Sequence, residues 1–283
     1  MAKIYEALQK AEEERKRKGA VRDQRTPDLD WDSTPQSVES AKAGVAERVR
    51  RWFFDRSSAV SSAYENYNRC RISLIQPESY AAEQFRTLRG RIDALATQRP
   101  VHSVAVISPN PGEGKTTAAI NLAAVTAMGV GQRVVLVDCD LRQPSVAGVL
   151  GIEPLKGVSE ILSGDASIDE AIIRMEDPGF DVIAVRSLPA NPSELLASER
   201  MSQLIEDLGQ RYDRVVVDTP AALGLPDVKA LAEICDGLLV VVRAGRTPSE
   251  SIEMVLELVD RRRVLGLMLN DDVSAPRAAS SRV

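Results

Sequence analysis

A phosphate-binding loop between a strand and a helix constrains this chain more than any other stretch. Residues 103–119 read S-V-A-V-I-S-P-N-P-G-E-G-K-T-T-A-A, and their apolar, β-branched start predicts a buried strand. Gly112 and Gly114 allow a tight turn whose N–H groups point inward, and Lys115 adds a positive charge. The Ala-rich continuation predicts a helix whose positive N-terminus faces a bound phosphate. Strand, loop and helix in this order favour a P-loop over a chance glycine turn before Lys-Thr.

The loop departs from related patterns at three positions. The strict pattern G-x-x-x-x-G-K-[ST] has glycine where this chain has Pro109. Switch-type partition and septum-positioning ATPases carry a signature lysine in K-G-G-x-G-K-T. Asn110 occupies the place of that lysine, and Pro111 replaces the first glycine of that motif. These differences count against that group of ATPases.

Composition limits the size and the binding class of the protein. With 283 residues, of which 44% are hydrophobic, one domain of about 200 residues plus an extension is expected. A net charge of −5 argues against a general polyanion binder, so we expect no nucleic-acid partner.

Cysteine usage and the lack of long apolar runs indicate a cytoplasmic protein. The three cysteines, Cys70, Cys139 and Cys235, form no C-x-x-C pair, which is typical of free thiols in a reducing compartment. The start M-A-K-I-Y-E lacks the apolar region of a signal peptide, and no run approaches the roughly 20 apolar residues of a membrane span. Any connection to a membrane is therefore expected to come through a partner.

We expect residues 1–72 to form a largely disordered N-terminal extension in three pieces. Residues 1–18 place apolar side chains at helical spacing, which predicts either a docking helix or a frayed, solvated one. Residues 19–44 are polar and poor in aliphatic side chains, which predicts a linker. Residues 45–56 combine an apolar stripe with several arginines, and a local packing helix is favoured over a membrane-binding or partner-binding one.

Strand-like runs alternate with helical segments over residues 73–270, the predicted ATP-binding domain. Continuous apolar strands between helices predict an α/β fold of the P-loop NTPase type, with a mostly parallel sheet covered by helices on both faces. The site should then lie at the carboxyl ends of the strands, and residues 271–283 should form a flexible tail. The expected strands after the P-loop are 134–138, 182–185, 215–218, 238–242 and 264–269, with helices at 193–211 and 249–261.

Three aspartates follow two of these strands and predict a magnesium site beside the P-loop. Asp138 and Asp140 end the run V-V-L-V-D-C-D, where alternation places both carboxylates on one face of the extended chain. Asp218 ends the run V-V-V-D in the same way. These carboxylates, with the hydroxyl of Thr116, could hold Mg²⁺, and one carboxylate could accept a proton from a hydroxyl.

The helix predicted to begin after Ser79 carries Glu83, Arg86 and Arg89 at three-residue spacing. These side chains lie around one broad face of the helix. Taken alone they are intrahelical ion pairs, worth about 0.2–0.5 kcal/mol each.

The site motifs resemble those of bacterial tyrosine autokinases of capsule and exopolysaccharide synthesis. P-G-E-G-K-T at 111–116 is similar to the Walker A motif of that family. V-D-C-D-L-R-Q-P at 137–144 is similar to its Walker A′ motif, and V-V-V-D-T-P at 215–220 to its Walker B motif.

Further stretches strengthen the resemblance, which covers about residues 72–270. E-x-x-R-x-x-R at Glu83, Arg86 and Arg89 is similar to the oligomerisation motif of the family. Residues 188–201 resemble its L-P-A…N-P-x-E-L-L loop in shortened form. The opening K-I-Y-E-A-L-Q-K-A-E resembles the start of stand-alone members of exopolysaccharide operons.

The resemblance implies a role for each site residue. Lys115 and the loop amides would bind the β- and γ-phosphates of ATP, and Thr116 would ligate Mg²⁺. Asp138 would be the base for a tyrosine hydroxyl, while Asp140 and Asp218 would assist the metal. The implied nucleotide-binding residues are Pro111, Gly112, Glu113, Gly114, Lys115, Thr116, Thr117 and, near the adenine, Asn270.

The resemblance also implies partners. Family members phosphorylate one another in a homo-oligomeric ring, and a membrane-embedded chain-length co-polymerase activates them. We therefore expect recruitment of this protein to the inner face of the cell membrane by such a partner.

The tyrosines of the chain do not follow the family pattern of a tyrosine-rich C-terminal tail. The sequence has five tyrosines and none after Tyr212. Tyr212 and Tyr80 are expected to be held in the fold. Tyr64 and Tyr67 lie in the polar stretch S-S-A-Y-E-N-Y-N-R and are the predicted phospho-acceptors.

Two other functions remain open from the sequence. One is an ATPase that is not a kinase and couples its nucleotide state to oligomerisation with a membrane partner. The other is an ATP-binding scaffold without turnover, which the presence of all three site carboxylates disfavours.

Overall fold

The structure, a computed structural model, describes residues 71–271. The predicted pieces of the N-terminal extension, with Tyr64 and Tyr67, lie outside the described residues, as does the tail beyond Asp271. No helix in the described range is both long enough and apolar enough to span a bilayer.

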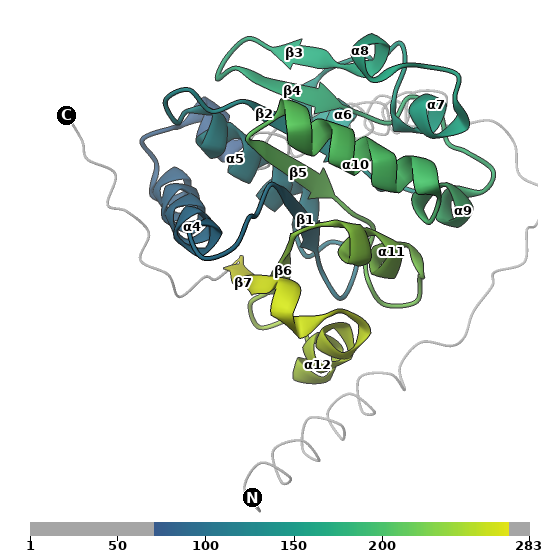
Figure 1. The fold of residues 1–283 in the computed structure, drawn as a ribbon. Coiled ribbons are helices and arrows are strands. Elements are labelled where there is room, and N and C mark those ends of the chain that lie inside the picture. Colours follow the sequence, from purple (N-terminus) through teal and green to yellow (C-terminus); the bar gives the residue numbers. More distant parts are fainter. Residues whose placement is uncertain (1–70, 272–283) are drawn as a thin grey trace, which may run out of the picture. The chain divides into compact units, whose positions relative to one another are not determined.

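One seven-stranded sheet forms the centre of the described structure (Figure 1). Its strands are β1 (Ser103–Ile107), β2 (Val134–Asp138), β3 (Ile173–Met175), β4 (Phe180–Ile183), β5 (Arg214–Asp218), β6 (Gly237–Arg243) and β7 (Val264–Asn270). Their order across the sheet is β3-β4-β2-β5-β1-β6-β7. Neighbouring strands are parallel except β3, which is antiparallel to β4. The predicted mostly parallel sheet is confirmed.

Helices cover both faces of this sheet. They are α3 (Ile72–Ile75), α4 (Tyr80–Ala96), α5 (Lys115–Ala127), α6 (Val146–Leu150), α7 (Val158–Ser163), α8 (Ile168–Ala171), α9 (Pro192–Leu196), α10 (Glu199–Arg211), α11 (Asp227–Ile234) and α12 (Ser249–Leu258), with a 3₁₀ turn at Arg261–Arg263. One apolar cluster joins the sheet to α7, α10, α11 and α12, and a second joins its other face to α4, α5 and α6. The prediction of helices on both faces is confirmed.

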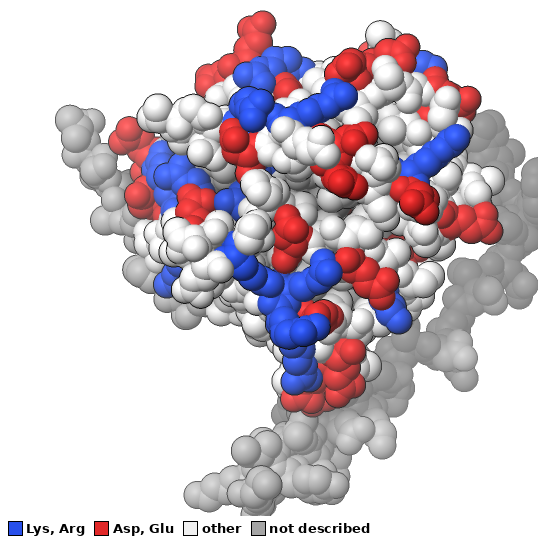
Figure 2. Space-filling model, in the orientation of Figure 1, with Lys and Arg blue, Asp and Glu red and all other residues white. Residues whose placement is uncertain are grey.

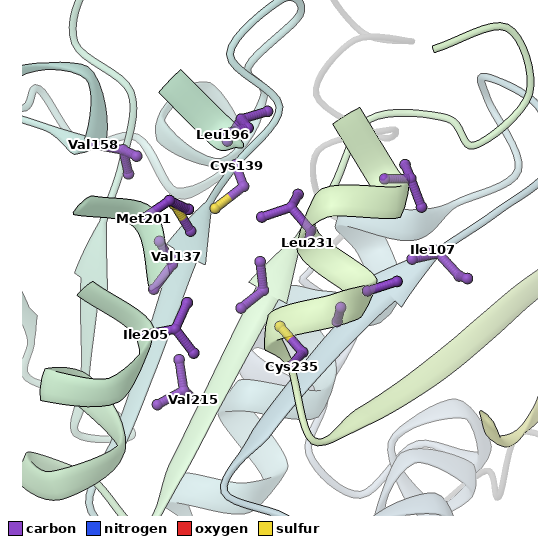
Figure 3. Packing of buried hydrophobic residues seen from close by; sticks show 14 of the residues in the cluster. Ile107, Val137, Cys139, Val158, Leu196, Met201, Ile205, Val215, Leu231 and Cys235 are labelled. Atoms are coloured by element: carbon purple, nitrogen blue, oxygen red, sulfur yellow. The ribbon is translucent and has the colours of Figure 1, made fainter. Parts of the chain in front are cut away.

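Alternation along the strands separates these two clusters. In Figure 3, Val137 and Val215 on the sheet face Ile205 of α10, and Leu231 of α11 lies over the same face. Cys139 belongs to this cluster and is fully buried, as the alternation between Asp138 and Asp140 requires. Branched side chains that fill both faces explain why the central strands read as continuous apolar runs.

Two predicted helices have different ends in the structure. The single helix predicted over 193–211 is wrong, because the chain forms α9 and α10 there. Ser198 between them has extended backbone (φ −78°, ψ 156°), and its Oγ accepts a hydrogen bond from the Met201 N–H at 3.3 Å, which caps α10. The helix predicted over 249–261 ends at Leu258, where Val259 becomes extended.

Charged side chains of both signs are interspersed over the face of the molecule shown in Figure 2. Several of them form exposed ion pairs, such as Arg211 with Asp169 at 2.7 Å. Pairs of this kind contribute little to stability, about 0–1 kcal/mol, because water and salt screen them.

Candidate functional site

The P-loop connects β1 to α5 and has two left-handed glycines. Gly112 has φ 76° and Gly114 has φ 101°, a region that glycine enters without steric cost. A Cβ on Gly114 would lie 2.1 Å from Nδ2 of Asn270. That same Nδ2 donates a hydrogen bond to the backbone oxygen of Glu113 at 2.8 Å. Gly114 is therefore required both by its backbone conformation and by the close approach of β7.

A cavity of about 460 Å³ opens over the loop at the carboxyl ends of the strands. The loop, the segment after β2 and the segment after β5 together form its wall. The residues that line it are Pro111, Gly112, Gly114, Lys115, Thr116, Thr117, Asp140, Arg142, Gln143, Ser145, Pro220, Ala221 and Leu225. Six of the eight predicted nucleotide-binding residues thus lie on this cavity, and Glu113 and Asn270 do not.

The Glu113 side chain points into the protein instead. It is 4% exposed and accepts hydrogen bonds from the Asn110 N–H at 2.9 Å and from the Thr247 hydroxyl at 2.7 Å. Together with the bond from Asn270 to its backbone, these contacts hold the loop against the segment after β6. The described contacts of the Glu113 side chain therefore stabilise the loop, and this side chain does not line the cavity.

Thr116 and Asp218 meet beneath the cavity. Thr116 Oγ1 donates to Asp218 Oδ2 at 2.6 Å and accepts from Ser145 Oγ at 2.9 Å. Burial raises the pKa of Asp218 to about 7, although the bond from Thr116 and the charge of Lys115 both lower it. Within the described residues, Asp218 Oδ1 is buried and has no hydrogen-bond partner.

Asp138 lies beside Asp218 because β2 and β5 are neighbours in register, with Asp138 opposite Asp218. Asp138 is fully buried and accepts hydrogen bonds from the N–H groups of Asp140 at 3.1 Å and Val146 at 3.2 Å. Burial, and next the negative charge of Asp218, raise the pKa of Asp138 well above its ordinary value. Two adjacent buried carboxylates favour a shared proton or a bound cation.

A magnesium ion fits this arrangement through hydroxyl, water and phosphate ligands. Over residues 71–271, no group of three or more His, Cys, Asp or Glu side chains is arranged to hold a metal, so the three aspartates do not form a protein cage. Mg²⁺ in nucleotide sites usually keeps several waters and takes one or two protein ligands. The Thr116 hydroxyl and the unpartnered oxygen of Asp218 are donors of this kind.

Ser193 and Asp227 were not predicted from the sequence, and both contact Arg142. The Arg142 guanidinium, which lines the cavity, donates to Asp227 Oδ2 at 2.8 Å and to Ser193 Oγ at 2.7 Å. The run G-L-P-D places Asp227 nine residues after the end of the Walker B strand, at the start of a helix, where an aspartate is common for structural reasons alone. Only the folded structure brings it to Arg142.

The three residues of the predicted oligomerisation motif lie on α4, and all three make contacts within the chain. Arg86 pairs with Glu83 at 2.6 Å on the exposed side of the helix. Arg89 Nη1 donates to the backbone oxygen of Val125 at 2.6 Å, in the last turn of α5. Arg89 therefore caps the end of the helix that begins at Lys115, whereas the ion pair described for Arg86 lies within its own helix.

Comparisons with known proteins place this site in a family. A family model described as an AAA domain matches residues 101–272, more than half of the chain. Tyrosine-protein kinase YwqD of Bacillus subtilis (strain 168) is 34% identical over 201 residues, which cover 70% of this chain and 84% of that protein. The chain belongs to the bacterial tyrosine-protein kinase family. The resemblance seen in the sequence motifs is thereby confirmed.

Other members of the tyrosine-protein kinase family differ in length. The succinoglycan biosynthesis transport protein ExoP of Rhizobium meliloti (strain 1021) is 35% identical over 205 residues, 71% of this chain, but the match spans only 26% of that protein. The solved structure of the kinase domain of Escherichia coli tyrosine kinase ETK matches with a TM-score of 0.69 and 29% sequence identity, covering 75% of this chain and 84% of the ETK chain. This chain thus matches the kinase part of the longer relatives.

Proposed function

We propose that this protein is an ATP- and Mg²⁺-dependent protein-tyrosine kinase that regulates exopolysaccharide or capsule polymerisation and export. One observation carries the proposal. Lys115, Thr116 and Asp140 face one cavity, with the buried pair Asp138 and Asp218 directly behind it, in a chain of the tyrosine-kinase family. The similarity to ExoP, a succinoglycan biosynthesis transport protein, supports the polysaccharide context.

In the proposed reaction, a tyrosine oxygen attacks the γ-phosphorus of ATP, and the bond from that phosphorus to the β,γ-bridging oxygen breaks. Lys115 and the loop N–H groups bind the phosphates, and Asp138 takes the phenolic proton. Burial and the charge of Asp218 raise the pKa of Asp138, so its carboxylate accepts a proton more readily than an ordinary aspartate does. Thr116, Asp140 and Asp218 would hold Mg²⁺, which would supply positive charge for the phosphate oxygens.

A homo-oligomer is part of the proposal, with α4 at the contact between copies. We expect Arg86→Ala to shift the oligomer toward monomer while the thermal unfolding temperature stays unchanged, because its bond to Glu83 is an exposed pair worth at most about 0.5 kcal/mol. Light scattering with Mg²⁺ and ATP measures the mass.

The matched comparison for this prediction is Arg89→Ala. Arg89 contacts the end of α5, so its loss should lower the unfolding temperature as well as the oligomer mass. If the Arg86→Ala protein keeps the oligomer mass of the wild type, this face of α4 is an ordinary solvated surface and not a contact between copies.

Acceptor tyrosines are proposed outside the described residues, at Tyr64 and Tyr67. Tyr212 is unsuited, because it is 8% exposed and its hydroxyl donates to Asp181 at 2.6 Å. Replacing Tyr64 and Tyr67 with phenylalanine should remove most phosphotyrosine and leave ATP binding intact. Mass spectrometry after incubation with Mg²⁺ and ATP locates the label.

Tyr80→Phe is the control for the acceptor test, since Tyr80 begins α4 and is half-exposed. Full labelling of the double variant would refute the assignment of Tyr64 and Tyr67. A wild-type chain without any phosphotyrosine that labels a polysaccharide co-polymerase instead would identify the partner as the acceptor. We propose that this membrane-embedded partner also recruits the protein to the inner face of the cell membrane.

A further inference from the structure

Three side chains from distant parts of the sequence meet beside the cavity. Arg142 follows β2, Ser193 lies in α9, and Asp227 begins α11. Arg142 Nε donates to Asp227 Oδ2 at 2.8 Å, Arg142 Nη2 donates to Ser193 Oγ at 2.7 Å, and Ser193 Oγ donates to Asp227 Oδ1 at 2.5 Å. The three hydrogen bonds close a ring, so each side chain fixes the other two.

The carboxylate of Asp227 is buried, while the arginine that it binds reaches the cavity. The Asp227 side chain is 0% exposed and that of Arg142 is 37% exposed. A buried carboxylate costs free energy unless a charged donor compensates it, so Arg142 is held firmly to this partner. Asp227 and Ser193 engage Nε and Nη2, and Nη1 is the remaining guanidinium nitrogen on a residue that lines the cavity.

The backbone of Arg142 also holds Asp140, one of the carboxylates proposed for the site, in place. Asp140 Oδ1 accepts hydrogen bonds from the N–H groups of Arg142 at 3.3 Å and Gln143 at 2.9 Å. Asp227 therefore fixes the guanidinium of Arg142, and the backbone of Arg142 fixes Asp140. A displacement of residues 140–143 would therefore move the Arg142 guanidinium and the Asp140 carboxylate together.

Three apolar residues also line the cavity. Pro220, Ala221 and Leu225 line it and belong to the segment that connects β5 to Asp227. Apolar side chains and a guanidinium that line the same cavity suit an aromatic ring that carries a phosphoryl-accepting oxygen. One face of the cavity thus matches the chemistry of an acceptor tyrosine.

We propose that Asp227 and Ser193 are positioning residues for phosphoryl transfer, which hold Arg142 against the transferred group on the acceptor side of the cavity. This role rests on the proposed kinase function. The side-chain hydrogen bonds described for Asp227 and Ser193 go to Arg142 and to each other, so both act on the transfer step through Arg142 and leave the affinity for nucleotide to Lys115 and the loop amides. Misplacing a group of this kind by about 1 Å costs roughly 100-fold in rate.

The experiment compares Asp227→Asn and Ser193→Ala in the full chain. Asparagine keeps the shape of Asp227 but loses its charge and one of its two acceptor oxygens for this ring. We expect Asp227→Asn to lower kcat for tyrosine phosphorylation by about 10- to 100-fold and Ser193→Ala by several-fold. The Kd for ADP should stay within about twofold, because the P-loop is unchanged.

A double-mutant cycle separates positioning from a general structural role. If Asp227 acts through Arg142, then Asp227→Asn adds little further loss once Arg142 is already alanine. Asp169→Asn, which removes an exposed pair with Arg211, is the matched control and should leave kcat unchanged. The variants Asp227→Asn and Asp169→Asn are also compared by thermal unfolding.

Two results would overturn the proposal. One is an additive effect of Asp227→Asn in the Arg142→Ala background. The other is a loss of ADP affinity that parallels the loss of kcat in both Asp227→Asn and Ser193→Ala. If the wild type only hydrolyses ATP, the kinase proposal fails, and the same cycle measured on hydrolysis still decides the positioning role.

Discussion

Lys115→Met should reduce ATP turnover to background, with a loss of at least about 100-fold. Lys115 begins α5, is 8% exposed and lines the cavity beside the left-handed turn at Gly114. Its ammonium group is the positive charge that the phosphates meet in the loop, and methionine has similar length without that charge. Release of labelled phosphate measures turnover, and equilibrium binding of labelled nucleotide measures affinity.

Lys156→Met is the control for this prediction. Lys156 is a partly exposed lysine whose described hydrogen bond goes from Nζ to the backbone oxygen of Asp165, and it does not line the cavity. Its variant should retain full turnover. Wild-type affinity and turnover in the Lys115→Met protein would mean that the phosphates bind elsewhere on the chain.

Asp138→Asn should lower phosphoryl transfer by about 100- to 10,000-fold while nucleotide still binds. An amide cannot take up the phenolic proton at neutral pH. Asparagine has the size of aspartate and can still accept one of the bonds from the Asp140 and Val146 N–H groups, so the fold should be preserved. Single-turnover kinetics with prebound nucleotide isolate the transfer step from binding.

Asp140→Asn is the informative comparison for Asp138. Asp140 lines the cavity, whereas Asp138 is fully buried beneath it. We expect the smaller loss for Asp140→Asn, together with a raised Mg²⁺ requirement. A larger loss of transfer in Asp140→Asn than in Asp138→Asn would assign the base to Asp140.

The central strands were predictable because each is a branched apolar run that ends in a polar residue. Such a run is buried on both faces only in a parallel sheet with two helical layers, which is the arrangement found. The antiparallel edge strand Ile173–Met175 has three residues and an exposed arginine, so its sequence carries no comparable signal. The break between α9 and α10 depends on one serine cap at Ser198, which a search for apolar periodicity overlooks.

The site residues that could be anticipated are those whose chemistry is local in the sequence. Gly112, Gly114 and Lys115 lie in one loop, and Asp138 and Asp218 end strands that the fold class places side by side. The inward orientation of Glu113 depends on Thr247, which is 134 positions away in the sequence. The ring that joins Arg142 to Ser193 and Asp227 likewise requires contacts across 51 and 85 positions. Such long-range pairings follow only from the packed structure.

The measurement that tests the kinase most directly is the fate of the γ-phosphate of ATP. Purified full-length chain is incubated with Mg²⁺ and γ-labelled ATP, alone and with the cytoplasmic segment of the polysaccharide co-polymerase, and the labelled amino acid is identified. The site described above predicts label on tyrosine of the chain or of the partner, and no label in the Lys115→Met protein. If label is recovered only as free phosphate, both with and without the co-polymerase segment, the kinase proposal is contradicted and the protein is an ATPase.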